Sequence, residues 1–275
     1  MRQSNRKNSA LVEALTKVAA GAMLVGLSSG VHAFTVTASV SATPDRAHTT
    51  STRLDLSGVQ GDTSFLSTNL TGVAGRLQTR ITQGANATTD AFLGDPTDQS
   101  LVWSWCIEPQ DYINTPTDLY EVGSLAASGF RQFGTSAGAQ RKADVAALFG
   151  GLIDTDTGRV FGTADDDGLN LGRRDRMTAF QLALWEIVQE TTSGAYDLAS
   201  GAFTLQGVGG VRNDADILAQ ANQWLAGLGT TLQARDDLAV WVLDTTASGP
   251  TGGQSQIAIS IVPLPAAVWL FGSAL

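Results

Sequence analysis

The sequence predicts an α+β fold in which a helical segment is inserted into a β-sandwich or barrel-like framework. Residues 34–110 contain runs that alternate apolar and polar side chains, as half-buried strands do. Residues 135–229 contain runs with helical spacing, and the alternation returns over 236–262. Because no internal repeat or proline-rich linker interrupts residues 34–261, we expect them to form a single domain.

The strands are expected where apolar residues recur at every second position. FTVTASV at 34–40 and GRLQTRITQ at 75–83 alternate in this way. In LVWSWCI at 101–107 the two tryptophans share one face of the expected strand, and Cys106 lies on the other. The last strands are expected at DLAVWVLD, residues 237–244, and QSQIAISIV, residues 254–262.

Three helices are expected in the middle of the chain. AQRKADVAALFGGLI at 139–153 has a glycine pair that could end it. NDADILAQANQWLAGLG at 213–229 has Asn213 or Asp214 to cap its start and Gly229 for its end. The strongest pattern is RMTAFQLALWEIVQET, residues 176–191. Its apolar face consists of Phe180, Ala183, Leu184, Ile187 and Val188.

The N-terminus has the three parts of a secretory signal peptide. Basic residues surround the start, an apolar run follows at 18–27, and the small-residue stretch SSGVHA comes next. Residues 1–33 are therefore assigned to the signal, with cleavage between Ala33 and Phe34. A membrane anchor is the alternative, but a bilayer span takes about 20 apolar residues and this run is shorter.

The charge that remains after cleavage is strongly acidic. The signal segment holds four basic residues and one acidic residue, so the mature chain has 13 of the 17 basic and 25 of the 26 acidic residues, a net charge of −12. Such a surface repels nucleic acid and anionic lipid headgroups. We therefore expect no nucleic-acid partner and a soluble exported protein at the cell surface or outside the cell.

The inventory of reactive residues argues against an enzyme. A cysteine protease needs a base beside its thiolate, and the only histidine after the signal peptide is His48, in a threonine-rich loop or strand edge. A zinc site needs three or four ligands. Neither phosphate-binding glycine spacing nor carboxylates at strand ends are found. We expect no catalytic activity and no cofactor.

The acidic loop DTDTGRVFGTADDDG at 154–168 is a weak calcium candidate. Asp154, Asp156 and Asp165 occupy positions one, three and twelve of an EF-hand count. However, position five is Gly158, position six is not glycine, and position twelve is not glutamate. A solvated acidic loop without a metal is the favoured interpretation.

Cys106 is the only cysteine of the chain, and Gln181 borders the apolar face of the helix at 176–191. A lone thiol in an oxidising compartment is a liability unless it is buried or capped. A buried glutamine needs hydrogen-bond partners or a chemical reason. Two interpretations stay open: a Cys106–Gln181 thioester, or a buried core cysteine with a glutamine hydrogen-bonded to a neighbouring strand.

The segments around these two residues resemble the signatures of bacterial thioester domains, which occur at the tips of surface adhesins and pili. In that family an aromatic-Cys-aliphatic-acidic segment supplies the thiol. A later helix with the pattern apolar-Gln-x-Ala-apolar-Trp supplies the glutamine. WCIE at 105–108 fits the first segment and FQLALW at 180–185 fits the second, in the family's order.

The resemblance covers residues 100–243 and implies an internal thioester between Cys106 and Gln181, with Glu108 and Trp185 shaping its pocket. A nucleophile on a surface target, an amine or a hydroxyl, would attack the acyl carbon of Gln181 and release the thiol. The protein would then act as a single-use covalent adhesin. The alternative is a non-reactive structural protein of the envelope or exopolysaccharide matrix, with Cys106 in its core.

The C-terminal segment 262–275, VPLPAAVWLFGSAL, resembles the start of a PEP-CTERM sorting signal in its VPLPA variant. That signal is found on exported proteins of Gram-negative bacteria and is processed by an exosortase. The glutamate of the commoner form is absent, and the apolar helix is incomplete, so the signal is either clipped or inactive. Transient anchoring in the inner membrane is expected only with a complete helix. Pro263 and Pro265 argue against an ordinary last strand.

Overall fold

The computed structural model describes fourteen stretches of the chain, all of which lie in one compact unit, Ala33–Leu275. They are residues 34–41, 46–54, 68–83, 94–95, 98–109, 118–130, 133, 137–155, 159–160, 172–190, 194, 196–209, 214–245 and 254–261.

Helices and strands are mixed along this unit. The strands are β1 Phe34–Ser41, β2 Arg46–Leu54, β3 Thr68–Gln83, β4 Gly94–Asp95, β5 Asp98–Cys106, β6 Asp118–Ser124, β7 Ile153–Asp154, β8 Arg159–Val160, β9 Phe203–Gly209, β10 Leu238–Asp244 and β11 Gln256–Ile261. The helices are α2 Gly138–Leu152, α3 Arg173–Gln189 and α4 Asp214–Gly227. The expected strands and helices are present, which agrees with the α+β prediction.

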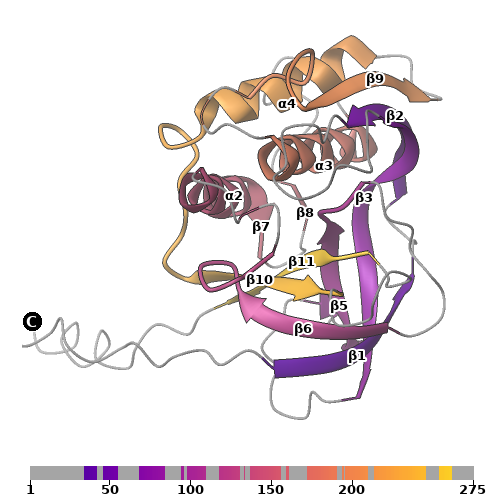
Figure 1. Ribbon diagram of the computed structural model, residues 1–275, viewed down its shortest axis with the longest axis vertical. Coiled ribbons are helices and arrows are strands. Elements are labelled where there is room, and N and C mark those ends of the chain that lie inside the picture. Colours follow the sequence, from indigo (N-terminus) through magenta and orange to yellow (C-terminus); the bar gives the residue numbers. More distant parts are fainter. Residues whose placement is uncertain are drawn as a thin grey trace, which may run out of the picture. The chain divides into compact units, whose positions relative to one another are not determined.

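Nine of the described strands form one antiparallel sheet in the order β4-β5-β11-β10-β6-β1-β3-β2-β9. The sheet curls, because β3 also pairs with β5 although the two are far apart in this order. Figure 1 shows β1, β6, β10 and β11 crossing below the helices, with β3 rising beside β5. Strands β7 and β8 form a separate pair.

Strand β3 divides its pairing between two parts of the sheet. Its first half pairs with β2, from Thr68 to Gly75. Its second half pairs with β1 and with β5, and the last pair with β5 joins Arg76 to Trp105. Cys106 therefore lies one residue beyond the β3–β5 ladder, where β3 has turned away toward β2.

Helix α3 lies at the centre of the described fold. It contacts α2 and α4 and the strands β2, β3, β5, β8 and β9. Every residue from Arg176 to Glu190 is buried. The predicted helix is confirmed and its five apolar-face residues are buried, but the opposite face does not lie in solvent, because neighbours surround α3 and its polar residues are buried as well.

Three aromatic rings join β5 to the helices. The ring of Trp105 packs edge-on against Phe149 of α2, with centroids 5.0 Å apart. It also lies 5.9 Å from Phe180 of α3, and the Phe149 and Phe180 centroids are 5.1 Å apart. Such pairs stabilise beyond their buried area. The tryptophan face of β5 thus fixes α2 and α3 beside the end of the strand.

The segment expected to be helical, 135–229, also contains strands. Strand β9 pairs with β2, and β7 and β8 form a hairpin. His48 lies in β2, which pairs on both sides with β3 and β9, rather than in a loop. Its neighbours are far away in sequence, so local composition could not show this pairing.

The glycine pair of the first helix has a different role from the predicted one. Helix α2 continues through Gly150 and Gly151 to Leu152. A Cβ atom on Gly150 would lie 2.6 Å from the carbonyl oxygen of Gln233. These glycines therefore allow a close approach of the chain after α4. Gly229, in contrast, has φ +71° just after α4, as a helix-ending glycine commonly does.

Candidate functional site

The structure brings Cys106 and Gln181 together. Cys106 is the last residue of β5 and is 4% exposed, and Gln181 of α3 is fully buried. The side-chain Nε2 of Gln181 donates a hydrogen bond to the backbone carbonyl oxygen of Cys106, with 2.7 Å between the two atoms. The pair that the sequence singled out is therefore in direct contact, while the thioester itself stays a prediction.

The departure of β3 explains why this contact exists. The β3–β5 ladder ends at Trp105, so β3 does not supply a donor to the next carbonyl along β5. A buried carbonyl without a partner costs about 1–3 kcal/mol. Gln181 supplies the missing donor from α3. Its own Oε1 is buried and has no hydrogen-bond partner among the described residues.

Two further glutamines make the same kind of contact with the next two residues. Nε2 of Gln189 donates to the carbonyl of Ile107 at 2.6 Å, and Nε2 of Gln254 donates to the carbonyl of Glu108 at 2.8 Å. Three side-chain amides thus bind three consecutive carbonyls. We call Gln181, Gln189 and Gln254 the amide clamp of the segment Cys106–Glu108.

Sequence reasoning missed two members of the amide clamp. Gln189 follows Gln181 by eight residues, so the two lie along one side of α3, and this spacing was a usable signal. Gln254 precedes β11 and comes close only because β11 pairs with β5. No local pattern marks it.

Glu108 joins the end of β5 to the start of β11. Its Oε2 accepts a hydrogen bond from the backbone N–H of Ser255 at 3.0 Å, and the side chain is 5% exposed. A second backbone contact, from Ile107 N to Ser255 O at 3.1 Å, reinforces the junction. The Glu108 carboxylate therefore stabilises the segment that carries Cys106. The pocket-shaping role that the family resemblance implies for Glu108 stays a prediction.

Trp185 lies one helical turn after Gln181 and is 3% exposed. Its ring packs edge-on against Phe203 of β9, with centroids 6.1 Å apart. Its Nε1 is buried and has no hydrogen-bond partner in the part of the chain that the structure describes. Trp185 therefore anchors α3 to β9, and its predicted place in a thioester pocket is untested by this contact.

A polar cluster lies on the face of the sheet toward which the Cys106 side chain points by strand alternation. Gln256 is the cross-strand partner of Cys106. Its Oε1 accepts hydrogen bonds from the hydroxyls of Thr79 and Ser104, and its Nε2 donates to the Tyr120 hydroxyl at 3.2 Å. Directly paired residues have neighbouring side chains, so Gln256 is a second glutamine beside the cysteine.

Charged groups are buried near the C-terminal end of α3. Burial raises the pKa of Glu186 to about 8, and the nearby Glu190 and Asp197 carboxylates act in the same direction. Oε1 of Glu186 accepts from the backbone N–H of Asp197 at 2.8 Å. The guanidinium of Arg141 donates to the carbonyls of Val188 and Glu190 at 2.8 and 2.7 Å. Burial lowers the pKa of Arg141.

The calcium candidate is only partly described. Asp154 lies in β7 and pairs with Arg159 of β8, so the loop begins as a hairpin. Asp156 and Asp165 lie outside the described residues. Within the described stretches, no group of three or more His, Cys, Asp or Glu side chains is placed to hold a metal ion.

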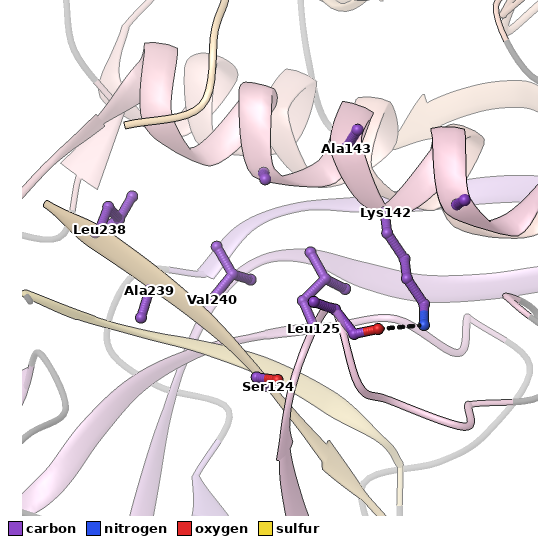
Figure 2. Close-up of a pocket in the computed structure, with 10 residues that line it drawn as sticks. Ser124, Leu125, Lys142, Ala143, Leu238, Ala239 and Val240 are labelled. Atoms are coloured by element: carbon purple, nitrogen blue, oxygen red, sulfur yellow. Dashed lines mark hydrogen bonds between the residues drawn. The ribbon is translucent and has the colours of Figure 1, made fainter. Parts of the chain in front are cut away.

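A cavity of about 580 Å³ lies between α2 and the β6 and β10 strands, away from the cysteine. Its ten lining residues are mostly alanine, leucine and valine, and Lys142 is their only charged member. Figure 2 shows Lys142 reaching from α2 to the carbonyl oxygen of Ala126, at 3.0 Å. Burial lowers the pKa of this amine. The lining also holds the hydroxyl of Ser124, and it contains no thiol, imidazole or carboxylate.

The predicted processing sites lie at the borders of the described chain. Phe34, the residue after the predicted cleavage point, begins β1 and pairs with Val122. Ala33 and the predicted sorting segment 262–275 lie outside the described residues. Of the helices that the structure describes, none has both the length and the apolar character needed to cross a membrane.

The comparisons with known proteins identify no relative. No family model matches the chain, and no curated protein or solved structure matches it either.

Proposed function

We propose that this chain is an exported bacterial protein of the cell surface or extracellular matrix that carries an internal thioester between Cys106 and Gln181. The observation that carries the proposal is the 2.7 Å hydrogen bond between the Gln181 amide and the Cys106 carbonyl. It places the two residues of the sequence motifs in contact, in a buried setting. The thioester would attach the protein covalently to a surface target.

The reaction balances without a cofactor. The thiol sulfur of Cys106 adds to the side-chain carbonyl carbon of Gln181, the C–N bond breaks, and ammonia leaves with the thiol proton. Later, once the buried site opens to the target, an amine or hydroxyl on that target attacks the same carbon and the thiol is released. Gln181 is fully buried, and burial protects the bond from hydrolysis because it excludes water.

The proposal also includes a division of the fold into a framework and an insertion. Six strands are joined in a ring of pairings, β5-β11-β10-β6-β1-β3 and back to β5. We infer that this ring is the barrel-like framework of the thioester domain and that the helical segment between β6 and β10 is its insertion. Cys106 comes from the framework and Gln181 from the insertion, so the bond would tie the two together.

The proposed location and processing partner rest on the predicted signal peptide, the acidic charge and the VPLPA segment. The predicted signal peptide would export the protein, and the acidic mature chain suits a soluble extracellular protein. An exosortase would be the processing partner if the VPLPA segment is active. The target would offer a surface amine or hydroxyl.

A non-reactive structural role is the second candidate, and one observation favours it. Gln189 and Gln254 make the same kind of contact as Gln181, but with the carbonyls of Ile107 and Glu108, which have no thiol. Their behaviour shows that a glutamine in this region has a structural use without any reaction. Cys106 would then be an ordinary buried core residue.

The intact mass of the mature protein distinguishes the two candidates. After mapping of the termini, the thioester predicts one ammonia less than the sequence mass and a Cys106 that resists alkylation in denaturant. Methylamine, chosen because it is small enough to enter a buried site, should restore the thiol and leave a methylamide on Gln181. Cys106→Ala is the control and should keep its full mass.

Peptide mapping assigns the acyl donor. The methylamide must lie on Gln181 and not on Gln256, the other glutamine beside Cys106. A pyroglutamate also loses ammonia, but it needs an N-terminal glutamine, and the expected mature terminus is Phe34. If the native protein has its full mass and a thiol that alkylates on unfolding, the thioester is wrong and the non-reactive structural role is supported.

A further inference from the structure

The geometry points to Gln189 and Gln254 as positioning residues for the Cys106–Gln181 condensation, and this inference rests on the proposed thioester. Each donates its amide to a carbonyl directly after the cysteine, at 2.6 and 2.8 Å. They contact the reacting segment without contacting the reacting atoms. Their role would be to hold Cys106 where the acyl carbon of Gln181 can meet it.

The reaction itself shows why a second and third amide are needed. Condensation expels the Nε2 atom of Gln181, which is the atom that donates to the Cys106 carbonyl. The bond that first aligns the two residues is therefore lost as the thioester forms. The contacts of Gln189 and Gln254 use other atoms and persist through the reaction.

The two amides come from different elements, so they hold the segment from two sides. Gln189 lies at the end of α3, the helix that also carries Gln181. Gln254 comes from the residues before β11, where Ser255 also binds the Glu108 carboxylate at 3.0 Å. The helix and the sheet thus meet at one short segment, Cys106–Glu108.

The burial of Gln189 is costly, which supports a specific role. Its side chain is 1% exposed, and its Oε1 has no hydrogen-bond partner within the described parts of the chain. A buried amide with an unsatisfied oxygen is destabilising, and an apolar side chain of similar volume would avoid this loss. The glutamine is therefore explained by the hydrogen bond that its Nε2 donates to the Ile107 carbonyl.

The test compares isosteric variants that lack the amide donor. Gln189→Met and Gln254→Met keep the side-chain length, and Gln233→Met is the matched control. Gln233 is exposed and also donates its amide to a backbone carbonyl, that of Thr230, at 3.2 Å. The readout is the fraction of purified mature protein that has lost ammonia. This fraction is measured over time by intact mass while the protein is incubated well below its melting temperature.

We expect the first two variants to condense about 10- to 100-fold more slowly than the wild type, since small displacements of reacting groups cost this much. Gln233→Met should match the wild type. A purely structural role would lower the melting temperature equally in the wild-type and Cys106→Ala backgrounds and leave the condensation rate unchanged.

A pH profile adds a readout that packing alone would not change. In Gln189→Glu the introduced carboxyl donates a hydrogen bond only when it is protonated. Condensation should therefore recover as the pH falls, and no such recovery should be seen in Gln189→Met. If a methionine variant does not fold, the glutamate variant still provides the comparison between low and high pH.

The outcomes separate this inference from the proposed function. If the wild type keeps its full mass, the thioester is absent and both proposals fall. If the wild type condenses and Gln189→Met and Gln254→Met condense at the same rate, the positioning role alone is overturned. Slower condensation in both, with a normal Gln233→Met, supports it.

Discussion

The side-chain nitrogen of Gln181 lies 2.7 Å from the carbonyl oxygen of Cys106, although 75 residues separate the two in the sequence. The contact joins the end of a strand to the middle of a buried helix. It forms where β3 leaves β5 and a strand carbonyl needs a donor from elsewhere. A gap in a β-ladder thus provides the place where a glutamine and a cysteine meet.

Glu186 should make stability depend on pH. Its ordinary pKa is near 4.5, and burial raises it to about 8 in the folded protein. Between these values the folded state holds a proton that the unfolded chain releases, so the free energy of unfolding should fall as the pH rises, by up to about 1.4 kcal/mol per pH unit. Glu186→Gln should remove this slope in denaturant titrations.

The same variant should be more stable than the wild type above the folded-state pKa, where the buried carboxylate is charged. Below the ordinary pKa both forms are neutral, and the two proteins should differ little. Equal slopes for the two proteins would mean that Glu186 is not the titrating group.

Arg141→Met should destabilise the end of α3. The buried guanidinium donates to the carbonyls of Val188 and Glu190, and hydrogen bonds to charged groups contribute about 1.5–3 kcal/mol each. We expect a loss of about 3 kcal/mol in the free energy of unfolding. Arg235→Met is the control. Arg235 forms a surface ion pair with Asp237, worth less than about 1 kcal/mol. Similar losses in both variants would contradict the assigned role.

Gly201→Ala should be more harmful than Gly229→Ala. Both glycines have positive φ, +103° and +71°. A Cβ atom on Gly201 would overlap the Oε2 atom of Glu190, which accepts from the Ala202 N–H at 2.9 Å, whereas Gly229 has open space. We expect about 1–2 kcal/mol for Gly229→Ala from the backbone alone and a larger loss for Gly201→Ala. Thermal melts that rank the two variants the other way would refute this.

Calcium should bind weakly or not at all. Asp154, the first candidate ligand, lies in β7 and pairs with Arg159 of β8, and it matches an EF-hand count only in part. Calorimetry on metal-stripped protein should show no site tighter than about 10⁻⁴ M, the range of extracellular modules. A tighter site that disappears in the Asp154→Ala, Asp156→Ala double variant would show that the acidic loop is a metal site.

The sequence predicted the elements well wherever the signal was local. Alternation located β1, β5, β10 and β11, and helical spacing located α2, α3 and α4. The position and the buried apolar face of α3 agree with the prediction, but its polar residues are buried too and do not form a solvent face. The periodicity of a helix reports its own faces, but what covers each face depends on partners distant in sequence.

The candidate site divides in the same way. Cys106 and Gln181 were identified by residue type and short motif, since the chemistry of a thioester requires those two groups. Gln254 could not be found, because it reaches Glu108 only through the pairing of β11 with β5. Gln256 likewise becomes a neighbour of the cysteine only through the strand register.

By itself the sequence determined which groups are available: one thiol, two histidines, an excess of acidic residues, and the local periodicities of strands and helices. The tertiary structure alone decided which of these groups meet. Strand order, register and the point at which β3 leaves β5 place Gln181 on the carbonyl of Cys106 and bury all sides of α3. Local patterns arise from neighbours along the chain, whereas these contacts depend on how distant segments pack to bury apolar surface and satisfy backbone hydrogen bonds.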